Sequence, residues 1–357
     1  MGADLSAGLG APNNLGGIYA ALGQYDRRLA EKREAFRLEP ASAWAYAVVV
    51  RSYLLLNRLD EAQATAEEAQ AKKLDSPNLR NFLYEIAFLR NDAAGMAQQV
   101  AWSAGKPGVE DVLLYAEADT AAYSGRFGKA RELCRRAVAS AEQAQEKETA
   151  AGYEAEAALR GALFGNAPAA RQRVAAALAL STGREIQYGA ALALAIAGDA
   201  DRANALADDL AKRFPEDTFA QFNYLPTIRA QLALSRGESS KAIEVLQAAA
   251  PYELGTPDVG GLTPVLYPVY VRGQAYLAAH QGSEAAAEFQ KILDHRGVVQ
   301  NEPIGALAHL GQARAYALQG DTAKARAAYN DFFSLWKDAD ADIPVLNAAK
   351  AEYARLK

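Results

Sequence analysis

Small, aromatic and helix-ending residues recur along this chain at the spacing of short helices joined in pairs by tight turns. In the first pair, Gly16 and Tyr19 lie seven and four residues before a turn at Gly23, and Ala35 lies twelve residues after it. A small residue on each helix lets the two helices approach closely, and a proline such as Pro40 ends the second one. The pattern predicts a helix–turn–helix unit in which Tyr19 fills the space between the helices.

The same unit returns at a fixed period. The turn positions Gly23, Asn57, Asn91 and Gly125 are each 34 residues apart. Asn replaces Gly at two of them, which fits a turn residue in the left-handed region of backbone conformation. Further turns are predicted, after small insertions, at Gly165, Gly198, Gly237, His280 and Gly320. We therefore predict an all-α chain of about nine helical hairpins, each of which stacks on its neighbours.

With this period, these turn residues and the small residues at fixed offsets, the chain from Asn13 onwards resembles the tetratricopeptide repeat family. The resemblance implies a right-handed superhelical solenoid and an interaction module without a catalytic centre. We predict a linker over residues 1–12, the repeat array over 13–343 with an inserted loop at about 251–264, and a capping helix over 344–357.

The C-terminal part carries a second resemblance. Segments such as Tyr276–Asp294, Ala313–Gly320 and Trp336–Pro344 are similar to the C-terminal repeat region of large bacterial serine/threonine protein kinases. This implies the regulatory or sensory part of a larger signalling protein. The chain lacks the lysine, His-Arg-Asp and Asp-Phe-Gly motifs of a kinase domain, so we do not expect it to be an enzyme. The compartment stays open, because in many such kinases a membrane span precedes the repeats.

Composition narrows the classes of partner and site. A net charge of −5 and a pI of about 5.5 argue against a nucleic-acid partner, which needs a clustered basic face. No apolar stretch is long enough for direct membrane insertion. The single cysteine, Cys134, is predicted to be a buried thiol. Because His280, His295 and His309 lack ligand spacing, we expect neither a metal nor another cofactor.

Three alternating acids near the C-terminus, Asp338, Asp340 and Asp342, resemble a calcium-binding loop only superficially. Ile343 stands where such a loop needs glycine, and Ala349 stands at its twelfth position in place of glutamate. We expect these acids instead to favour the N-terminus of the helix that begins at Pro344.

The resemblance also implies a concave groove, lined by the first helix of each hairpin at positions ten, six, three and two residues before the turn. The residues that we predict to bind a ligand there are Asn81, Glu85, Phe88, Tyr115, Asp119, Tyr123, Tyr188, Thr227, Gln231, Tyr270, Gln274 and Arg314. Tyrosine recurs at one offset and a polar residue often follows one turn later. Such a lining favours an extended peptide or an amphipathic helix, although the tyrosines could equally pack only against neighbouring helices.

Relatives that hold a peptide's terminal carboxylate use Lys and Asn in adjacent units, and this chain has Asn13, Gly17, Ala47 and Arg51 at those places. That mode of binding is therefore not expected. We predict a scaffold for a protein or peptide partner, with homodimerisation through the first unit or the 251–264 loop as the alternative. An enzyme that uses Glu85 or Asp119 would need a pKa-shifting partner, which the sequence does not reveal.

Overall fold

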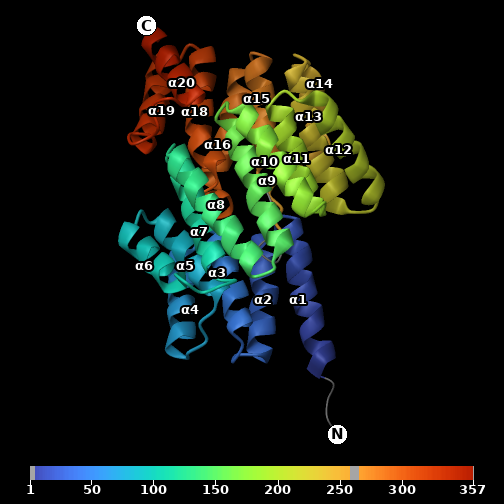
Figure 1. Cartoon of the computed structure of the whole chain (residues 1–357), viewed down its shortest axis with the longest axis vertical. Helices are drawn as coiled ribbons and strands as arrows, with labels where there is room; N and C mark the ends of the chain where they lie inside the picture. Colours follow the sequence, from blue (N-terminus) through green and yellow to red (C-terminus); the bar gives the residue numbers. More distant parts are fainter. Residues whose placement is uncertain (1–4, 258–264, 357) are drawn as a thin grey trace.

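The computed structural model describes residues 5–257 and 265–356, with side chains from residue 12 onwards. Within these residues the chain is helical and contains no strand, and successive helices pair along the chain (Figure 1). The hairpins are α1 (Leu5–Ala21) with α2 (Tyr25–Leu38), α3 (Ala43–Leu55) with α4 (Leu59–Ala71), α5 (Pro77–Leu89) with α6 (Ala93–Ser103), α7 (Glu110–Tyr123) with α8 (Phe127–Gln143), α9 (Lys147–Leu163) with α10 (Ala167–Leu180), α11 (Arg184–Ile196) with α12 (Ala200–Arg213), α13 (Leu225–Ser235) with α14 (Ser239–Val245), α15 (Tyr267–Ala278) with α16 (Gly282–Asp294), and α18 (Pro303–Leu318) with α19 (Thr322–Leu335).

Four further elements complete the described chain. A π-helical turn, η1 (Ala220–Tyr224), leads into α13, and a 3₁₀ turn, η2 (Leu246–Ala249), extends α14. The short α17 (Arg296–Val299) joins the last two hairpins, and α20 (Pro344–Arg355) follows them as the predicted last helix. The fold is thus a tetratricopeptide-like helical solenoid.

The nine predicted turn residues all occupy turns. Each has a positive φ, from 56° at Asn57 to 86° at Gly165. The amides that follow close the helix end, as where Asn57 N donates to Leu54 O at 2.8 Å and Arg58 N donates to Tyr53 O at 2.9 Å. This hydrogen bonding is typical of a helix that ends in a left-handed residue. The prediction of Asn and His280 at such positions is confirmed, because His280 has a φ of 57°.

Small residues allow the close packing that the sequence predicted. A Cβ atom on Gly16 would lie 2.7 Å from Cε of Lys32, whose aliphatic chain crosses the helix at that point. A Cβ atom on Gly311 would lie 2.5 Å from the ring of Phe289. Cys134 is buried as predicted, and burial raises the pKa of its thiol.

The first helix begins earlier than expected. Residues 1–12 are predicted to be a linker, whereas α1 starts at Leu5 and includes Pro12. Glycines and a proline lower the helix propensity of this segment, and for that reason its sequence is typical of a linker. Residues 1–4 lie outside the described range.

The array closes upon itself, which the sequence did not predict. The ends of its early first helices are met by segments from the last third of the chain. Thr256 N donates to Ala20 O at 3.0 Å, the Arg296 guanidinium donates to Leu89 O at 3.1 Å, and Trp336 Nε1 donates to Tyr123 O at 2.9 Å. These carbonyls have no partner within their own helices, so each contact satisfies a polar group that closure would otherwise bury.

Close backbone contacts reinforce this closure. A Cβ atom on Gly297 would lie 1.9 Å from Leu54 O, and one on Gly255 would lie 2.2 Å from Ala21 O. The described part of the predicted inserted loop, residues 251–257, therefore packs against the first hairpin, where Tyr25 donates its hydroxyl proton to Leu254 O. The rest of that loop, residues 258–264, lies outside the described residues.

The acids before α20 serve the closure and not the last helix alone. Asp340 N donates to Gly125 O at 3.0 Å, and the Asp340 carboxylate accepts from Gly128 N at 2.6 Å. Asp340 thus caps the first turn of α8, which its sequence position next to α20 did not indicate. Figure 1 shows α18, α19 and α20 near α7 and α8, from which they are distant in sequence.

Candidate binding pocket

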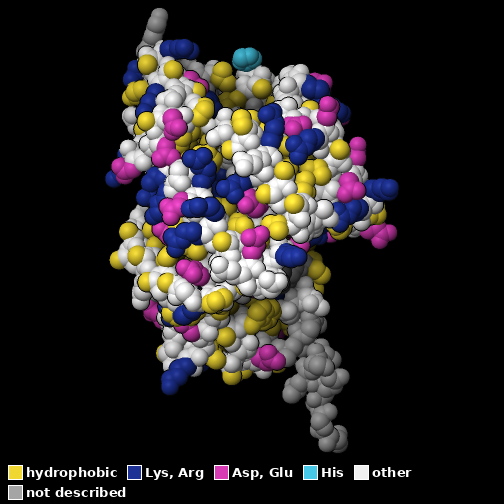
Figure 2. Space-filling model, viewed as in Figure 1, with side chains coloured by type: hydrophobic (Ala, Val, Ile, Leu, Met, Phe, Trp, Pro, Cys, Tyr) yellow, Lys and Arg dark blue, Asp and Glu magenta, His cyan; other side chains and the backbone are white. Residues whose placement is uncertain are grey.

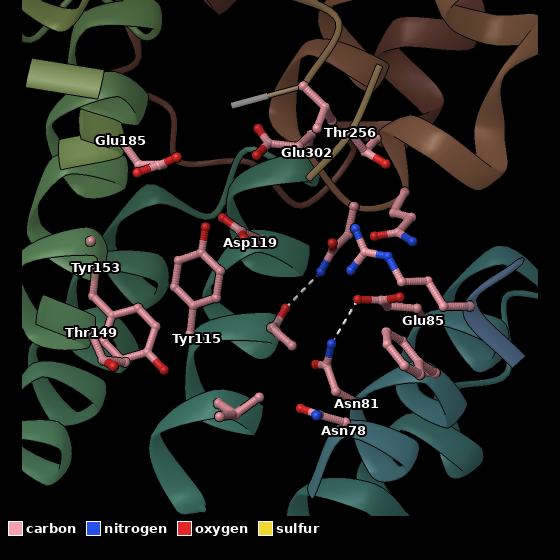
Figure 3. Close-up of a pocket in the computed structure, with 18 of the residues that line it drawn as sticks. Asn78, Asn81, Glu85, Tyr115, Asp119, Thr149, Tyr153, Glu185, Thr256 and Glu302 are labelled. Carbon is pink, nitrogen blue, oxygen red and sulfur yellow. Dashed lines mark hydrogen bonds between the residues drawn. The ribbon is translucent and has the colours of Figure 1, made fainter. Parts of the chain in front are cut away.

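A pocket of about 520 Å³ lies on the inner side of the solenoid (Figure 3). Residues of α3, α5, α7, α9 and α11 form its walls, and the link between α17 and α18 lies over it. Thr256 and Val265 also border it. The closure of the solenoid therefore turns part of the inner surface into an enclosed site.

The pocket is strongly acidic. Six of its described lining residues are carboxylic acids, against a single cation, Arg51; the acids are Glu85, Asp119, Glu146, Glu148, Glu185 and Glu302. Several already have partners, since Glu148 accepts from Ser181 and Glu185 pairs with Arg184. The charge of this pocket therefore disfavours an anionic occupant.

Glu85, on α5, is the exception among these acids. Its Oε1 atom accepts from Asn81 Nδ2 at 2.7 Å, while its Oε2 atom is buried and has no hydrogen-bond partner among the described residues. The residue is 8% exposed. Burial raises the pKa of Glu85 to about 7, against the opposing influence of Arg51 and of the Asn81 hydrogen bond.

Asp119, on α7, is held by the chain itself. It forms a buried ion pair with Arg160 of α9. The Tyr115 ring stacks on Tyr153 with centroids 4.8 Å apart, and the Arg160 guanidinium lies 5.4 Å from the Tyr115 centroid. Burial raises the pKa of Asp119, while Arg160 and the Tyr115 hydroxyl act in the opposite direction. Asp119 and Tyr115 thus shape the wall next to Glu85.

A second acid pair, Glu156 and Glu302, is buried near Asp119. Burial raises the pKa of Glu156 to about 8 and that of Glu302 well above its usual range, and the two acids raise each other's pKa further. The Tyr267 hydroxyl donates to Glu302 at 3.5 Å. Burial, and not a catalytic partner, thus accounts for the perturbed acids of this region.

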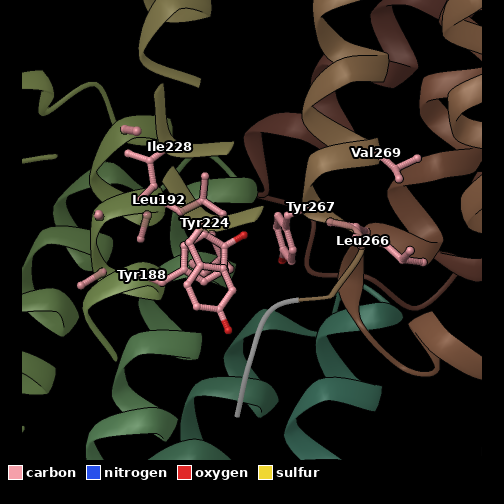
Figure 4. Packing of buried hydrophobic residues seen from close by; sticks show 14 of the residues in the cluster. Tyr188, Leu192, Tyr224, Ile228, Leu266, Tyr267 and Val269 are labelled. Atoms are coloured by element: carbon pink, nitrogen blue, oxygen red, sulfur yellow. The ribbon is translucent and has the colours of Figure 1, made fainter. Parts of the chain in front are cut away.

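Four of the twelve predicted ligand-binding residues come together in the pocket: Asn81, Glu85, Tyr115 and Asp119. Figure 3 shows their side chains around the same space. Tyr188 and Thr227 lie elsewhere and are fully buried. Tyr188 stacks on Tyr224 with centroids 4.0 Å apart, in a core that Tyr267 also joins (Figure 4). They offer no surface to a ligand, which corrects their assignment to an open groove.

The other predicted residues pack against the chain. Phe88 meets Tyr123 edge to face at 5.1 Å, and Tyr270 meets Phe289 at 6.0 Å. Arg314 forms a two-point ion pair with Glu352 of α20, at 2.9 and 3.0 Å. Gln231 and Gln274 are half-buried and do not line the pocket. The interpretation that the tyrosines pack against neighbouring helices thus describes Tyr188 and Tyr270.

Several lining residues were not predicted. Ala47 and Arg51 occupy groove positions of the second hairpin, but they were considered only as a carboxylate clamp. Tyr153 and Glu185 lie near the starts of α9 and α11, farther from the turn than the offsets reach. Val298–Glu302 had no local signal, because only the closure brings this segment over the pocket.

A basic cluster lies outside the pocket. Figure 2 shows Lys and Arg side chains gathered over α7 and α8. The α8 sequence supplies Arg126, Lys129, Arg131, Arg135 and Arg136 at or next to this helix. Lys129 pairs with Glu117 at 2.7 Å and Arg136 with Glu110 at 3.8 Å, so acids on α7 partly neutralise the cluster. The net charge did not indicate this local excess, and the absence of a nucleic-acid partner stays a prediction.

Two further properties concern the described range as a whole. Across residues 5–257 and 265–356, no group of three or more His, Cys, Asp or Glu side chains is placed to hold a metal ion. None of the helices in the same ranges is both long and apolar enough to cross a bilayer.

Comparison with known proteins gives likeness of fold only. No family model matches the sequence, and no curated protein matches it. Among solved structures, the chain is similar to yeast Tom70, with 12% identity and a TM-score of 0.40, over 96% of this chain and 89% of that one. It is similar to a tetratricopeptide repeat protein from Parabacteroides merdae, with 14% identity and a TM-score of 0.37, over 86% and 98% of the two chains. Human IFIT1, solved as a dimer with m7Gppp-AAAA, gives 15% identity and a TM-score of 0.45, over 94% and 82%.

Proposed function

We propose that this protein is a non-catalytic scaffold that binds a short segment of a partner protein in its internal pocket. The observation that carries the proposal is the pocket itself, a built polar site in which the buried Oε2 atom of Glu85 lacks a partner among the described residues. Buried polar atoms are almost always hydrogen-bonded in folded proteins, so an unpartnered carboxylate oxygen in a cavity points to an occupant.

The size of the pocket limits what can enter. Its volume of about 520 Å³ lies in the usual range for ligand sites, roughly 300–1,000 Å³. A folded domain does not fit such a space, whereas one or two side chains of a peptide do. Trp44, which is 40% exposed, and the exposed Glu146 and Glu148 border the pocket where a segment could arrive from solvent.

The wider setting of this scaffold follows from the C-terminal resemblance. Tyr276–Asp294 and Trp336–Pro344 are similar to the repeat region of bacterial serine/threonine kinases, and this similarity supports a regulatory role within a signalling protein. In that setting the partner segment would report on, or recruit, another component of the same signalling system. This part of the proposal rests on the sequence resemblance.

Site-specific photo-crosslinking tests the proposal. Trp44→p-benzoylphenylalanine places a reactive aromatic group at the pocket, and Phe222→p-benzoylphenylalanine serves as the matched control. Phe222 is also an exposed aromatic, at 45% against 40%, but it does not line the pocket. Illumination in an extract of the source cells should yield a protein adduct at position 44 that is absent at position 222. Equal adducts at both positions, or none at position 44, would contradict the proposal.

Self-assembly remains the second candidate, and one observation favours it. Leu15 and Ile18 on α1 are 41% and 54% exposed, so the first hairpin presents apolar side chains to solvent. The described part of the 251–264 loop, in contrast, packs inward against α1 and α2. A single monomeric mass by light scattering across the micromolar range would count against self-assembly.

A further inference from the structure

We infer that the group recognised in the pocket is a basic side chain, the guanidinium of an arginine or the ammonium of a lysine in the partner segment, and that Glu85 pairs with it. This inference rests on the proposed function and names its chemistry. The site extends from Glu85 and Asn81 on α5 to the acids of α7, α9, α11 and the link before α18 (Figure 3).

The hydrogen-bond inventory of the pocket supports a donor as the occupant. A carboxylate only accepts hydrogen bonds, and the free Oε2 of Glu85 therefore needs a donor. Asn81 already uses Oε1, so it also fixes the orientation of the carboxylate. A guanidinium carries several N–H donors in a plane and an ammonium carries three, and either forms a charge-assisted hydrogen bond with an acid.

The charge of the walls distinguishes a cation from a neutral donor. Six acids line the site, and the cations nearest to them have other partners. Arg160 pairs with Asp119, and Arg51 donates to Pro257 O at 3.3 Å and lies over the Phe82 ring. A cationic side chain lowers the repulsion among these acids, and a neutral group does not.

Aromatic stacking is not the main source of recognition. Tyr115 is stacked on Tyr153, and Arg160 lies over the same ring. The faces of Tyr115 are thus engaged by the chain, and an incoming group meets its edge and hydroxyl. This revises the expectation that tyrosines anchor the ligand, and places the recognition on the carboxylates.

The same arrangement makes binding depend on pH. Arg51 on α3 and Asp119 on α7 are the charged groups that act on Glu85, with the Asn81 amide on its own helix, and burial holds the pKa of Glu85 at about 7. A cation binds the ionised form, so affinity should rise with pH. Because the ionised fraction of such an acid changes from about one tenth at pH 6 to about nine tenths at pH 8, the affinity should change about ten-fold.

Calorimetric titration with matched peptides tests the inference. The probes are acetyl-Ala-Ala-Arg-Ala-Ala-amide and the same peptide with citrulline, which keeps the shape of arginine without its charge. We expect the arginine peptide to bind at least ten-fold more tightly at pH 8, and to lose about ten-fold at pH 6. E85Q should remove both effects, whereas E67Q, a change on the exposed face of α4, should leave them unchanged.

The outcomes separate this inference from the proposed function. Equal affinity for the two peptides, or no binding of either at millimolar concentration, would overturn the cationic assignment. If adducts at position 44 persist in that case, the pocket binds a segment of other chemistry and the proposed function stands. Spermidine serves as a third probe, and tighter binding of spermidine than of the arginine peptide would keep the cationic chemistry but contradict a peptide source. The peptide pair requires no variant, so the test holds even if E85Q folds poorly.

Discussion

At the scale of single residues, Glu85 combines features that rarely coexist without a purpose. It is buried, one of its oxygens has no partner in the described chain, and its neighbours include the cation Arg51 and the acid Asp119. Keeping an unpaired carboxylate buried costs stability, and such costs are concentrated at functional sites. A hydrophobic residue would pack there at lower cost, so we interpret Glu85 as retained for binding.

This interpretation predicts a particular pH dependence of stability. The folded pKa of Glu85, about 7, lies above the value near 4.3 of an unfolded glutamate, so folding retains its proton. The contribution of Glu85 is therefore fully present below about pH 4, and is lost as pH rises through 7. E85Q should match the wild type at pH 5 and exceed it at pH 8.5 by roughly 1–3 kcal/mol. Urea denaturation at both pH values measures this, and equal stability at pH 8.5 would show that Glu85 is not buried as an ionised group.

At the scale of helices and turns, repeat units form the frame and glycine contacts allow it to close. The short α17 lies against the end of α3, where Gly297 approaches Leu54 O too closely for any side chain. Gly255 makes a comparable approach to Ala21 O. These two glycines stand in segments whose sequence is typical of loops, and the structure shows that their lack of a side chain is what the closure requires.

The glycine contact yields a test of the closure. Gly297→Ala should destabilise the protein by about 2 kcal/mol or more, because its Cβ atom would lie 1.9 Å from a backbone oxygen. Gly189→Ala on α11 is the matched control, since its Cβ atom would meet Ala155 Cβ at an ordinary 3.4 Å. Alanine is favoured over glycine within a helix, so this control should stabilise the protein by about 0.5–1 kcal/mol. An unchanged free energy of unfolding for Gly297→Ala would mean that α17 does not pack on α3.

The sequence predicted elements better than their long-range arrangement. A strict period identified all nine turns, including Asn57 and His280, because the turn geometry is local. It also found Asn81, Glu85, Tyr115 and Asp119, since these lie on the inner side of two adjacent hairpins. It did not find the contacts of Arg296 or Trp336, because each joins residues that no repeat spacing relates. For the same reason Tyr188 was assigned to a surface that later hairpins bury.

At the scale of the whole molecule, the account describes a closed solenoid. Its accessible surface is 15,067 Å², close to the roughly 14,000 Å² expected for a compact monomer of 38.1 kDa. An open superhelix would expose its concave face in addition. Closure therefore replaces a long groove with one enclosed acidic pocket, and this changes the expected ligand from an extended helix to a short basic segment.

The central claim is the closure, and small-angle X-ray scattering of the full chain in dilute solution tests it most directly. A compact chain of 357 residues has a radius of gyration of about 21 Å. Nine hairpins stacked in an open array at about 10 Å per helix layer would extend about 90 Å and give a value above about 26 Å. We predict a radius of gyration close to 21 Å with a single compact distance distribution. A value above about 26 Å with an elongated distribution would contradict the closed solenoid, and with it the pocket.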